Sequence, residues 1–158
     1  MRSHMGIRDA TAADVPRVIE LLTQMTIAPE APRERDPHDP ACVPAYVRAL
    51  ADIQADPRQR VLVVEEGGRV VATATLMVLP NLSHGGRPVA QLESVVVDER
   101  ERGRGVGERL VRYCVDEARR VGCFRMQLTS NATREGAHRF YRRLGFSASH
   151  VGFKLTLG

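Results

Sequence analysis

Three glycines stand close together at Gly103, Gly105 and Gly107, with Arg102 before them and Arg104 among them. Glycine lets the backbone approach a ligand closely, and the first N–H groups of a helix point outward at the positive end of its dipole. Because the segment lies between a valine-rich run and a helix-like pattern, it predicts a binding site for an anion. A tight strand-to-helix turn without a ligand is the alternative interpretation.

Two common phosphate-binding loops do not fit the residues that follow. A Walker loop continues with Gly-Lys-Ser/Thr, whereas Gly107 is followed by Glu108. A dinucleotide-binding loop needs a third small residue where Arg109 or Leu110 stands. It also needs an acid at the end of the next strand, where residues 129–131 read Thr-Ser-Asn. Both classes are therefore excluded.

An acidic residue, Glu93, lies within the otherwise apolar run 89–97. Strand alternation predicts that Glu93 shares a face with Gln91, Val95 and Val97. An acid in such a strand is explained by a nearby active-site cleft or by a structural salt bridge to an arginine.

The charge of the chain is unevenly distributed. Its net charge is +4, but residues 100–143 hold twelve arginines and five acidic residues, a local charge of +7. This basic half favours an anionic ligand. Nucleic acid would also suit the charge, but aromatic residues make up 4% and Trp is absent, so we expect no nucleic-acid partner.

Several other classes of protein are excluded by composition. Three cysteines are too few and too scattered for a disulfide framework or a zinc site, and we predict no metal. No apolar run approaches the roughly 20 residues of a membrane helix, so a cytoplasmic protein without a membrane partner is expected. Residues 1–5 read as an expression-tag scar, which leaves 6–158 as a single domain.

Elements that would position these residues can be read from the periodicity. Apolar spacing and turn residues predict a mixed α/β fold with three antiparallel strands and one strand–helix–strand crossover. Residues 29–44 are rich in proline and charge and predict a loop. The expected strands are 6–8, 61–65, 70–79, 89–97 and 124–128, with a last pair within 146–157. Four helices are expected: one after Thr11, one over 43–55, one from Gly107 to Gly122 and one capped by Thr133.

Two linked motifs resemble those of the GNAT superfamily of N-acetyltransferases. Arg102-x-x-Gly105-x-Gly107 after a valine-rich strand resembles its pyrophosphate loop. Asn131 followed by His138-Arg139-Phe140-Tyr141-x-x-Leu144-Gly145-Phe146 is similar to its second signature. The likeness covers residues 7–157. It implies a splayed mixed sheet flanked by about four helices, and acetyl-CoA as co-substrate.

The resemblance also implies which residues meet acetyl-CoA. Main-chain groups of residues 95–97 would hydrogen-bond the pantetheine arm like a neighbouring strand. N–H groups of residues 103–107, with Arg102 and Arg104, would hold the pyrophosphate. The residues implied in cofactor binding are Val95, Val96, Val97, Arg102, Gly103, Arg104, Gly105, Val106, Gly107, Asn131, His138, Phe140 and Tyr141.

In the mechanism that the resemblance implies, Tyr141 gives a proton to the departing thiolate, and Glu93 deprotonates the acceptor amine through water. The oxyanion would meet main-chain N–H groups around Val95. A core aromatic is the alternative role for Tyr141, and His138 is an alternative acid or base.

The acceptor is expected to be a primary amine of a small molecule. Residues 138–141 and Ser149-His150 are similar to the aminoalkylphosphonate branch of the superfamily. A protein N-terminus, a lysine side chain, or a non-catalytic acyl-CoA sensor are the alternatives. An apolar alternation predicts a homodimer built on the last hairpin, at Val151, Phe153, Leu155 and Leu157.

Overall fold

The computed structural model describes residues 5–25 and 41–157. The chain divides into two compact units, Met1–Gln127 and Leu128–Gly158. Most of the predicted loop over residues 29–44 lies outside the described residues, as do residues 1–4 of the expected tag.

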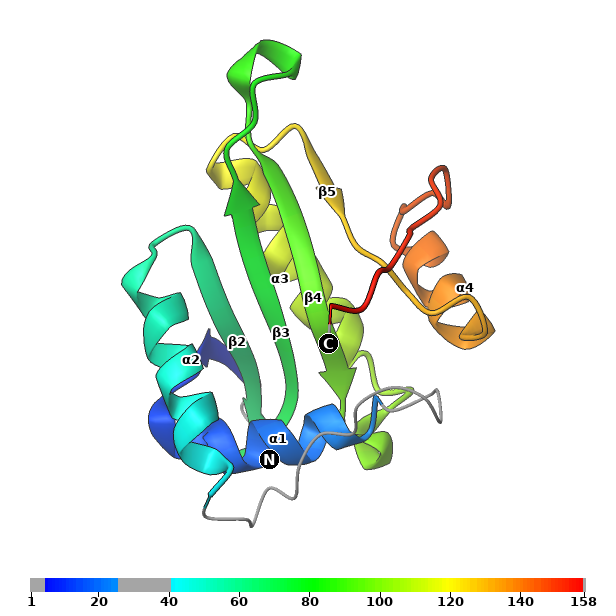
Figure 1. The fold of residues 1–158 in the computed structure, drawn as a ribbon. Coiled ribbons are helices and arrows are strands. Elements are labelled where there is room, and N and C mark those ends of the chain that lie inside the picture. The colour runs from blue at the N-terminus through cyan, green and yellow to red at the C-terminus, as the bar shows by residue number, and fades with distance from the viewer. Residues whose placement is uncertain (1–4, 26–40, 158) are drawn as a thin grey trace. The chain divides into compact units, whose positions relative to one another are not determined.

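The first unit is built on a five-stranded sheet in the order β1-β2-β3-β4-β5 (Figure 1). All neighbouring strands are antiparallel except β4 and β5, which are parallel. The predicted meander is confirmed, and the two glycines at its first turn, Gly67 and Gly68, adopt the positive φ that a tight hairpin needs. The strands are β1 (Met5–Asp9), β2 (Gln59–Glu66), β3 (Arg69–Leu79), β4 (Val89–Val97) and β5 (Arg125–Gln127).

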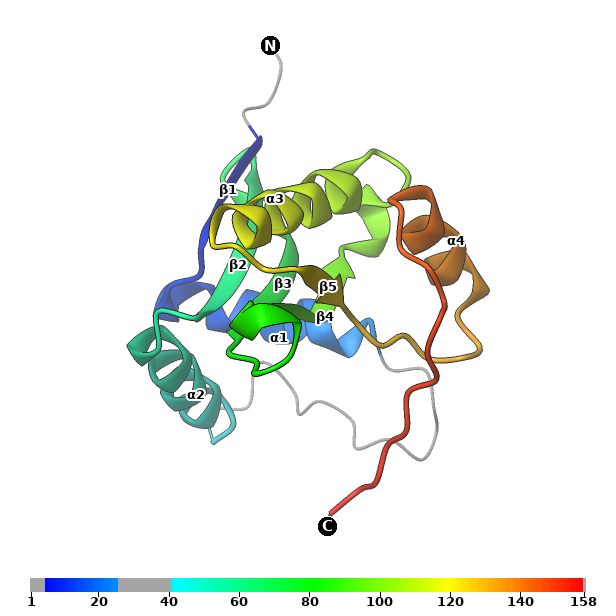
Figure 2. The ribbon, with the colours of Figure 1, turned by 90° about the horizontal axis from the view of Figure 1, so that it is seen from above.

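Helices cover both faces of this sheet (Figure 2). α1 (Val15–Thr23) and α2 (Val43–Ala55) lie on one face, and α3 (Val106–Arg120) lies on the other. Apolar residues at helical spacing bury one stripe of α3 against the sheet: Val106, Leu110, Val111, Cys114 and Ala118. None of the described helices is long and apolar enough to cross a membrane.

A β-bulge interrupts β4 beside Glu93. Glu93 pairs with Thr75 of β3, and the next pair is Val96 with Thr73. The step from one pair to the next therefore covers three residues along β4 but only two along β3. Ser94, inside this step, has φ 52°, an uncommon conformation for a residue other than glycine.

Because of the bulge, the prediction that Glu93 shares a face with Val95 and Val97 is wrong. Directly paired residues of antiparallel strands project to the same face, so Val96 lies on the face of Glu93, while Val97, paired with Ala72, projects to the opposite face. Simple alternation placed Val95 and Val97 with Glu93. The extra residue in β4 reverses the alternation beyond Ser94.

The second unit contains one helix, α4 (Glu135–Arg143), which ends before Gly145 at φ 95°. Arg134 occupies its N-cap position, so the predicted Thr133 cap is wrong. The predicted final strand pair is also wrong, because residues 146–157 form no strand. The apolar side chains of that segment are exposed, and such residues gain little from local pairing without a buried face.

Candidate functional site

The glycine-rich segment connects β4 to α3 through a short 3-10 helix, Glu99–Glu101. Gly103 has φ 77°, and Gly105, at the N-cap of α3, has φ 79°. L side chains rarely adopt this conformation, so these two positions require glycine locally. Gly107 lies in the first helical turn, where its backbone is ordinary. The segment therefore exposes N–H groups at the positive end of a 15-residue helix, which suits an anion.

The two arginines of this segment have different partners. Arg102 donates from Nε to the Val97 carbonyl at 3.1 Å, which ties the loop back to the end of β4. Arg104 pairs with Glu101 and, at 3.5 Å, with Glu66. Two carboxylates therefore offset the charge of Arg104, whereas Arg102 has a main-chain partner and keeps its charge for a ligand.

A buried carboxylate, Asp98, anchors the start of the loop. Asp98 was not among the site residues predicted from the sequence. Its side chain is 2% exposed and pairs with Arg17 of α1 and, at 2.9 Å, with Arg69 of β3. It also accepts the Arg100 N–H at 3.0 Å. Burial raises the pKa of Asp98, but the Arg100 N–H and Arg17 outweigh burial, so its pKa lies below the ordinary value. Asp98 therefore stays ionised at neutral pH.

α1 holds the same turn at a second point. The Gln24 side-chain oxygen accepts the Glu99 N–H at 3.0 Å. Arg17 is itself fixed, because its Nε donates to the Val70 carbonyl at 3.0 Å. An acid directly after a valine-rich strand was the only local signal for this network, since its partners come from distant parts of the sequence.

Glu93 is half-buried and is held by its neighbour on the strand. Gln91 donates from its side-chain nitrogen to Glu93 Oε1 at 2.9 Å. Within residues 5–25 and 41–157, Glu93 forms no ion pair, which removes support for the structural salt bridge. Its carboxylate is therefore available to a water or a ligand.

The edge of β4 toward β5 is only partly paired. The parallel pairs run from Val89 with Arg125 to Gln91 with Gln127. Beyond Gln91, residues 92–97 of β4 have no further strand pair on that side within the described part of the chain. Main-chain groups along residues 95–97 can therefore meet an extended ligand.

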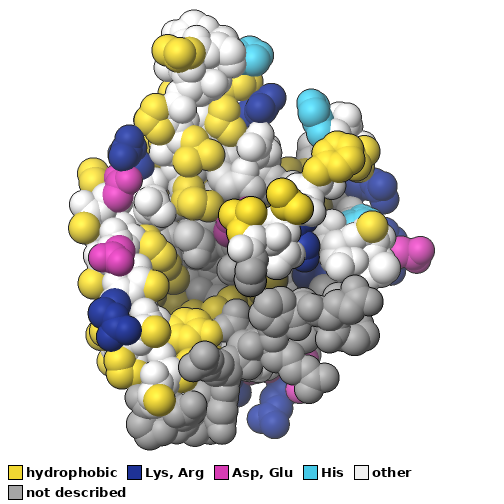
Figure 3. All heavy atoms as spheres, viewed as in Figure 1, with side chains coloured by type: hydrophobic (Ala, Val, Ile, Leu, Met, Phe, Trp, Pro, Cys, Tyr) yellow, Lys and Arg dark blue, Asp and Glu magenta, His cyan; other side chains and the backbone are white. Residues whose placement is uncertain are grey.

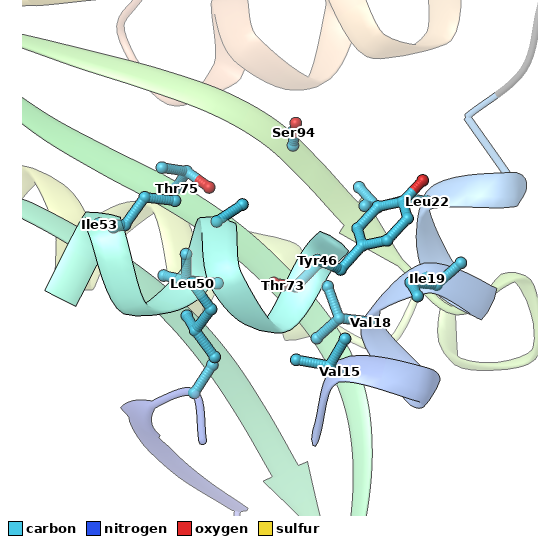
Figure 4. Close-up of a pocket in the computed structure, with 13 residues that line it drawn as sticks. Val15, Val18, Ile19, Leu22, Tyr46, Leu50, Ile53, Thr73, Thr75 and Ser94 are labelled. Carbon is cyan, nitrogen blue, oxygen red and sulfur yellow. The ribbon is translucent and has the colours of Figure 1, made fainter. Parts of the chain in front are cut away.

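A cavity of about 140 Å³ lies between α1, α2 and the sheet in the first unit. Figure 3 shows hydrophobic side chains gathered along the α2 side of this face. The close-up in Figure 4 shows that the cavity extends to Ser94, the bulge residue next to Glu93. The sequence did not reveal this cavity, because its walls come from five separate elements.

Tyr141 lies on α4 among aromatic side chains. Its ring meets Phe140 edge to face, with centroids 5.1 Å apart, and Phe146 at 5.6 Å. Burial raises the pKa of the Tyr141 phenol above its ordinary value, and Arg134 offsets only part of this. The phenol therefore keeps its proton at neutral pH, as a proton donor must.

Asn131 and His138 organise the turn before α4. Asn131 Oδ1 accepts from the Thr133 N–H at 2.9 Å and from the Thr133 hydroxyl at 2.8 Å. His138 Nε2 donates to the Asn131 carbonyl at 2.9 Å. Arg143 lies 5.9 Å from the Phe140 ring centroid. These contacts hold the second signature together around Tyr141.

The predicted residues thus form two groups. Glu93, residues 95–97 and the loop 102–107 form one continuous strand–turn–helix in the first unit. Asn131, His138, Phe140 and Tyr141 gather around α4 in the second.

Comparisons with known proteins identify the family of the chain. The sequence model of the Acetyltransferase (GNAT) family matches residues 20–146. The chain is similar to glucosamine 6-phosphate N-acetyltransferase from Trypanosoma brucei brucei, at 33% identity over 97% of this chain and 96% of that protein. It is also similar to aminoalkylphosphonate N-acetyltransferase from Salmonella typhimurium, at 31% identity over 65% of this chain and 66% of that protein.

Among solved structures, a protein described as a transcriptional regulator from Bacillus halodurans C-125 has a similar fold, with a TM-score of 0.87 and 32% identity. The match covers 98% of this chain and 100% of that chain. The mixed sheet and the four helices that the sequence predicts are therefore those of a known family. This chain belongs to the acetyltransferase (GNAT) family and is an acetyl-CoA-dependent N-acetyltransferase.

Proposed function

We propose that the enzyme transfers the acetyl group of acetyl-CoA to the primary amine of a small molecule, by direct attack within a ternary complex. The observation that carries this proposal is the strand–turn–helix of residues 93–107. It joins an acid, an unpaired strand edge and a helix N-terminus with two obligatory glycines.

The amine needs a base, because it arrives as an ammonium ion and cannot attack a thioester until it loses a proton. Glu93 serves as this base through a water molecule. Gln91 orients the carboxylate, and the absence of an ion pair within the described residues leaves it available. Main-chain N–H groups around Val95, at the bulge, stabilise the oxyanion.

The departing thiolate needs an acid. A thiol has an ordinary pKa of about 8.5 and a phenol one of about 10. The raised pKa of Tyr141 widens this difference, so the phenol gives up its proton as negative charge develops on the sulfur. Tyr141 supplies this proton. Phe140 and Phe146 fix its ring, and burial keeps it protonated.

Acetyl-CoA is bound by the residues named from the sequence. The main chain of Val95, Val96 and Val97 pairs with the pantetheine arm, and the N–H groups of residues 103–107 hold the pyrophosphate together with Arg102. Arg104 contributes by changing partner from Glu101 and Glu66. Cofactor binding by Asn131, His138 and Phe140 is supported by the resemblance of their motif to the second signature of the family.

A small-molecule acceptor is supported by the relatives, whose names place their activity on an amino sugar phosphate and on aminoalkylphosphonates. The test is a panel of primary amines incubated with acetyl-CoA, followed by thiol release and by mass spectrometry of the products. We expect an N-acetylated small amine and equal amounts of free CoA. Modification of peptide N-termini or lysines alone would contradict the proposal. Acetyl-CoA binding by calorimetry without turnover of any amine or peptide would identify a sensor.

A further inference from the structure

The cavity beside the proposed base is apolar over most of its wall. α1, α2 and the strands β2, β3 and β4 contribute to it. In Figure 4 the side chains of Val15 and Val18 lie in the lower part of the view, and the hydroxyls of Tyr46, Thr75 and Ser94 lie in the upper part. The cavity therefore has an apolar body and a polar end.

The polar end adjoins Glu93. Ser94 follows Glu93 along β4, and Thr75 is the residue directly paired with Glu93 across the β3–β4 ladder. A primary amine that reaches Glu93 from this cavity would leave its non-reacting part among the apolar side chains of α1 and α2.

None of the described residues that line the cavity is charged. Arg17, the basic residue of α1, is already engaged by Asp98 and Glu20 and does not line the wall. A phosphate or carboxylate placed in an apolar site without a cationic partner loses its hydration and gains no ion pair, so its binding there is unfavourable. The part of the wall that the described residues form is thus unsuited to an anionic group.

The size of the cavity limits what it can hold. Its volume of about 140 Å³ is close to that of an engineered apolar cavity of about 150 Å³ that binds benzene. A phenyl ring or a short branched alkyl group would fill it.

We infer that the acceptor is a primary amine whose non-reacting part is apolar, uncharged and about the size of a benzene ring, and that this part occupies the cavity between α1, α2 and β4. The inference rests on the proposed function for the position of the amine. It assigns to this enzyme a different acceptor class from the phosphorylated and phosphonylated amines of its relatives.

The first experiment compares acceptors. Initial rates with acetyl-CoA are measured for 2-phenylethylamine, glucosamine 6-phosphate and 2-aminoethylphosphonate. We expect kcat/KM for 2-phenylethylamine to exceed that of either anionic amine by at least about tenfold, the size of effect that apolar pockets produce. A preference for either anionic amine would leave the proposed function intact and overturn the inference.

A matched pair of variants locates the site. Ala49 and Ala45 are both exposed on α2, one turn apart, but only Ala49 lines the cavity. Leucine is a good helix former, so both variants should fold. Ala49→Leu should raise KM for 2-phenylethylamine roughly tenfold, by narrowing the cavity, without changing KM for acetyl-CoA. Ala45→Leu should match the parent. Parent-like kinetics for Ala49→Leu would overturn the inference.

A binding measurement separates this inference from the proposed function. 2-Phenylethanol, which has the same apolar body without the amine, is titrated by calorimetry into enzyme saturated with CoA. Binding that is lost in Ala49→Leu and retained in Ala45→Leu would support the cavity assignment even if no amine were acetylated. Absence of binding to the parent enzyme would overturn it.

Discussion

The two groups of site residues are held in different ways. The β4–α3 segment is anchored by a buried acid, two arginines and a glutamine, and its loop conformation depends on Gly103 and Gly105. α4 has no fully buried residue, and its half-buried tyrosine is positioned by two aromatic neighbours. Ion pairs and a glycine-dependent backbone hold the β4–α3 loop in the fixed geometry that a pyrophosphate needs. Packing against two aromatic rings is enough to position a single proton donor. Acetyl-CoA affinity should therefore depend mainly on the β4–α3 loop, whereas the proton donor on α4 should affect mainly the chemical step.

Tyr141→Phe should separate the chemical step from cofactor binding most clearly. Loss of the hydroxyl removes a positioned proton donor, which typically lowers the rate about 10²–10⁴-fold. The ring contacts with Phe140 and Phe146 do not need the hydroxyl, so the melting temperature and the acetyl-CoA Kd should change little. Steady-state kinetics and calorimetry provide the measurement.

Two controls sharpen that result. Tyr113→Phe removes a hydroxyl that contacts Arg60 on the first unit and should leave turnover unchanged. An acyl donor with a more acidic thiol should reduce the Tyr141→Phe defect, because its leaving group needs the proton less. Parent-like turnover in Tyr141→Phe would mean that Tyr141 is a core aromatic only.

Gly105→Asp should produce the opposite pattern, a loss of affinity. It places a carboxylate where the pyrophosphate binds and a side chain at φ 79°, so acetyl-CoA should bind about a hundredfold more weakly. Gly68→Asp is the matched control, because Gly68 has φ 77° in the β2–β3 turn. It shares the backbone strain and should keep the parental Kd by calorimetry. An acetyl-CoA affinity that is the same in Gly105→Asp and Gly68→Asp would mean that the loop does not bind the pyrophosphate.

Glu93→Gln tests the part of the first group assigned to chemistry. We expect turnover to fall roughly tenfold or more at neutral pH, where the amine is protonated, and to approach the parent at alkaline pH, where free amine is abundant. Glu108→Gln, on the exposed surface of α3, should leave the pH–rate profile unchanged. A Glu93→Gln profile that overlays the parent would assign Glu93 a structural role.

Asp98→Asn should weaken the anchoring of the loop without touching the reacting atoms. KM for acetyl-CoA should rise several-fold while kcat stays near the parent, and the free energy of unfolding should fall by about 3 kcal/mol. Asp116→Asn, in a surface pair with Arg119, should change neither. An unchanged KM for acetyl-CoA would restrict Asp98 to stability.

The pH dependence of that stability difference follows from the lowered pKa of Asp98. A carboxylate with a lowered folded-state pKa stabilises the protein above its unfolded pKa of about 3.9, and this contribution is lost as the pH falls below that value. Parent and Asp98→Asn should therefore differ in denaturant midpoint at pH 7 and converge in acid.

The smallest effect is expected from the exposed tail of the second unit. We propose a homodimer that covers Phe153 and Leu155, which are 95% and 83% exposed. Light scattering at assay concentration should give twice the monomer mass, and Phe153→Ser with Leu155→Ser should give the monomer. A monomeric parent would refute this proposal.

The sequence by itself determined the features that depend on neighbouring residues. Gly103 and Gly105 specify their loop through local backbone conformation, and Gly67-Gly68 specifies the hairpin turn in the same way. The apolar stripe of α3 follows from helical spacing. These signals, together with the second signature, identified the family and its co-substrate.

Only the tertiary structure decided what depends on distant partners. The bulge at Ser94 reverses the faces of β4, because register is set by pairing with β3 rather than by alternation within one strand. Asp98 acquires its role from Arg17 and Arg69, and the cavity acquires its walls from five elements. Residues 146–157 alternate like a strand but form none, since a strand needs a partner that its own sequence does not supply.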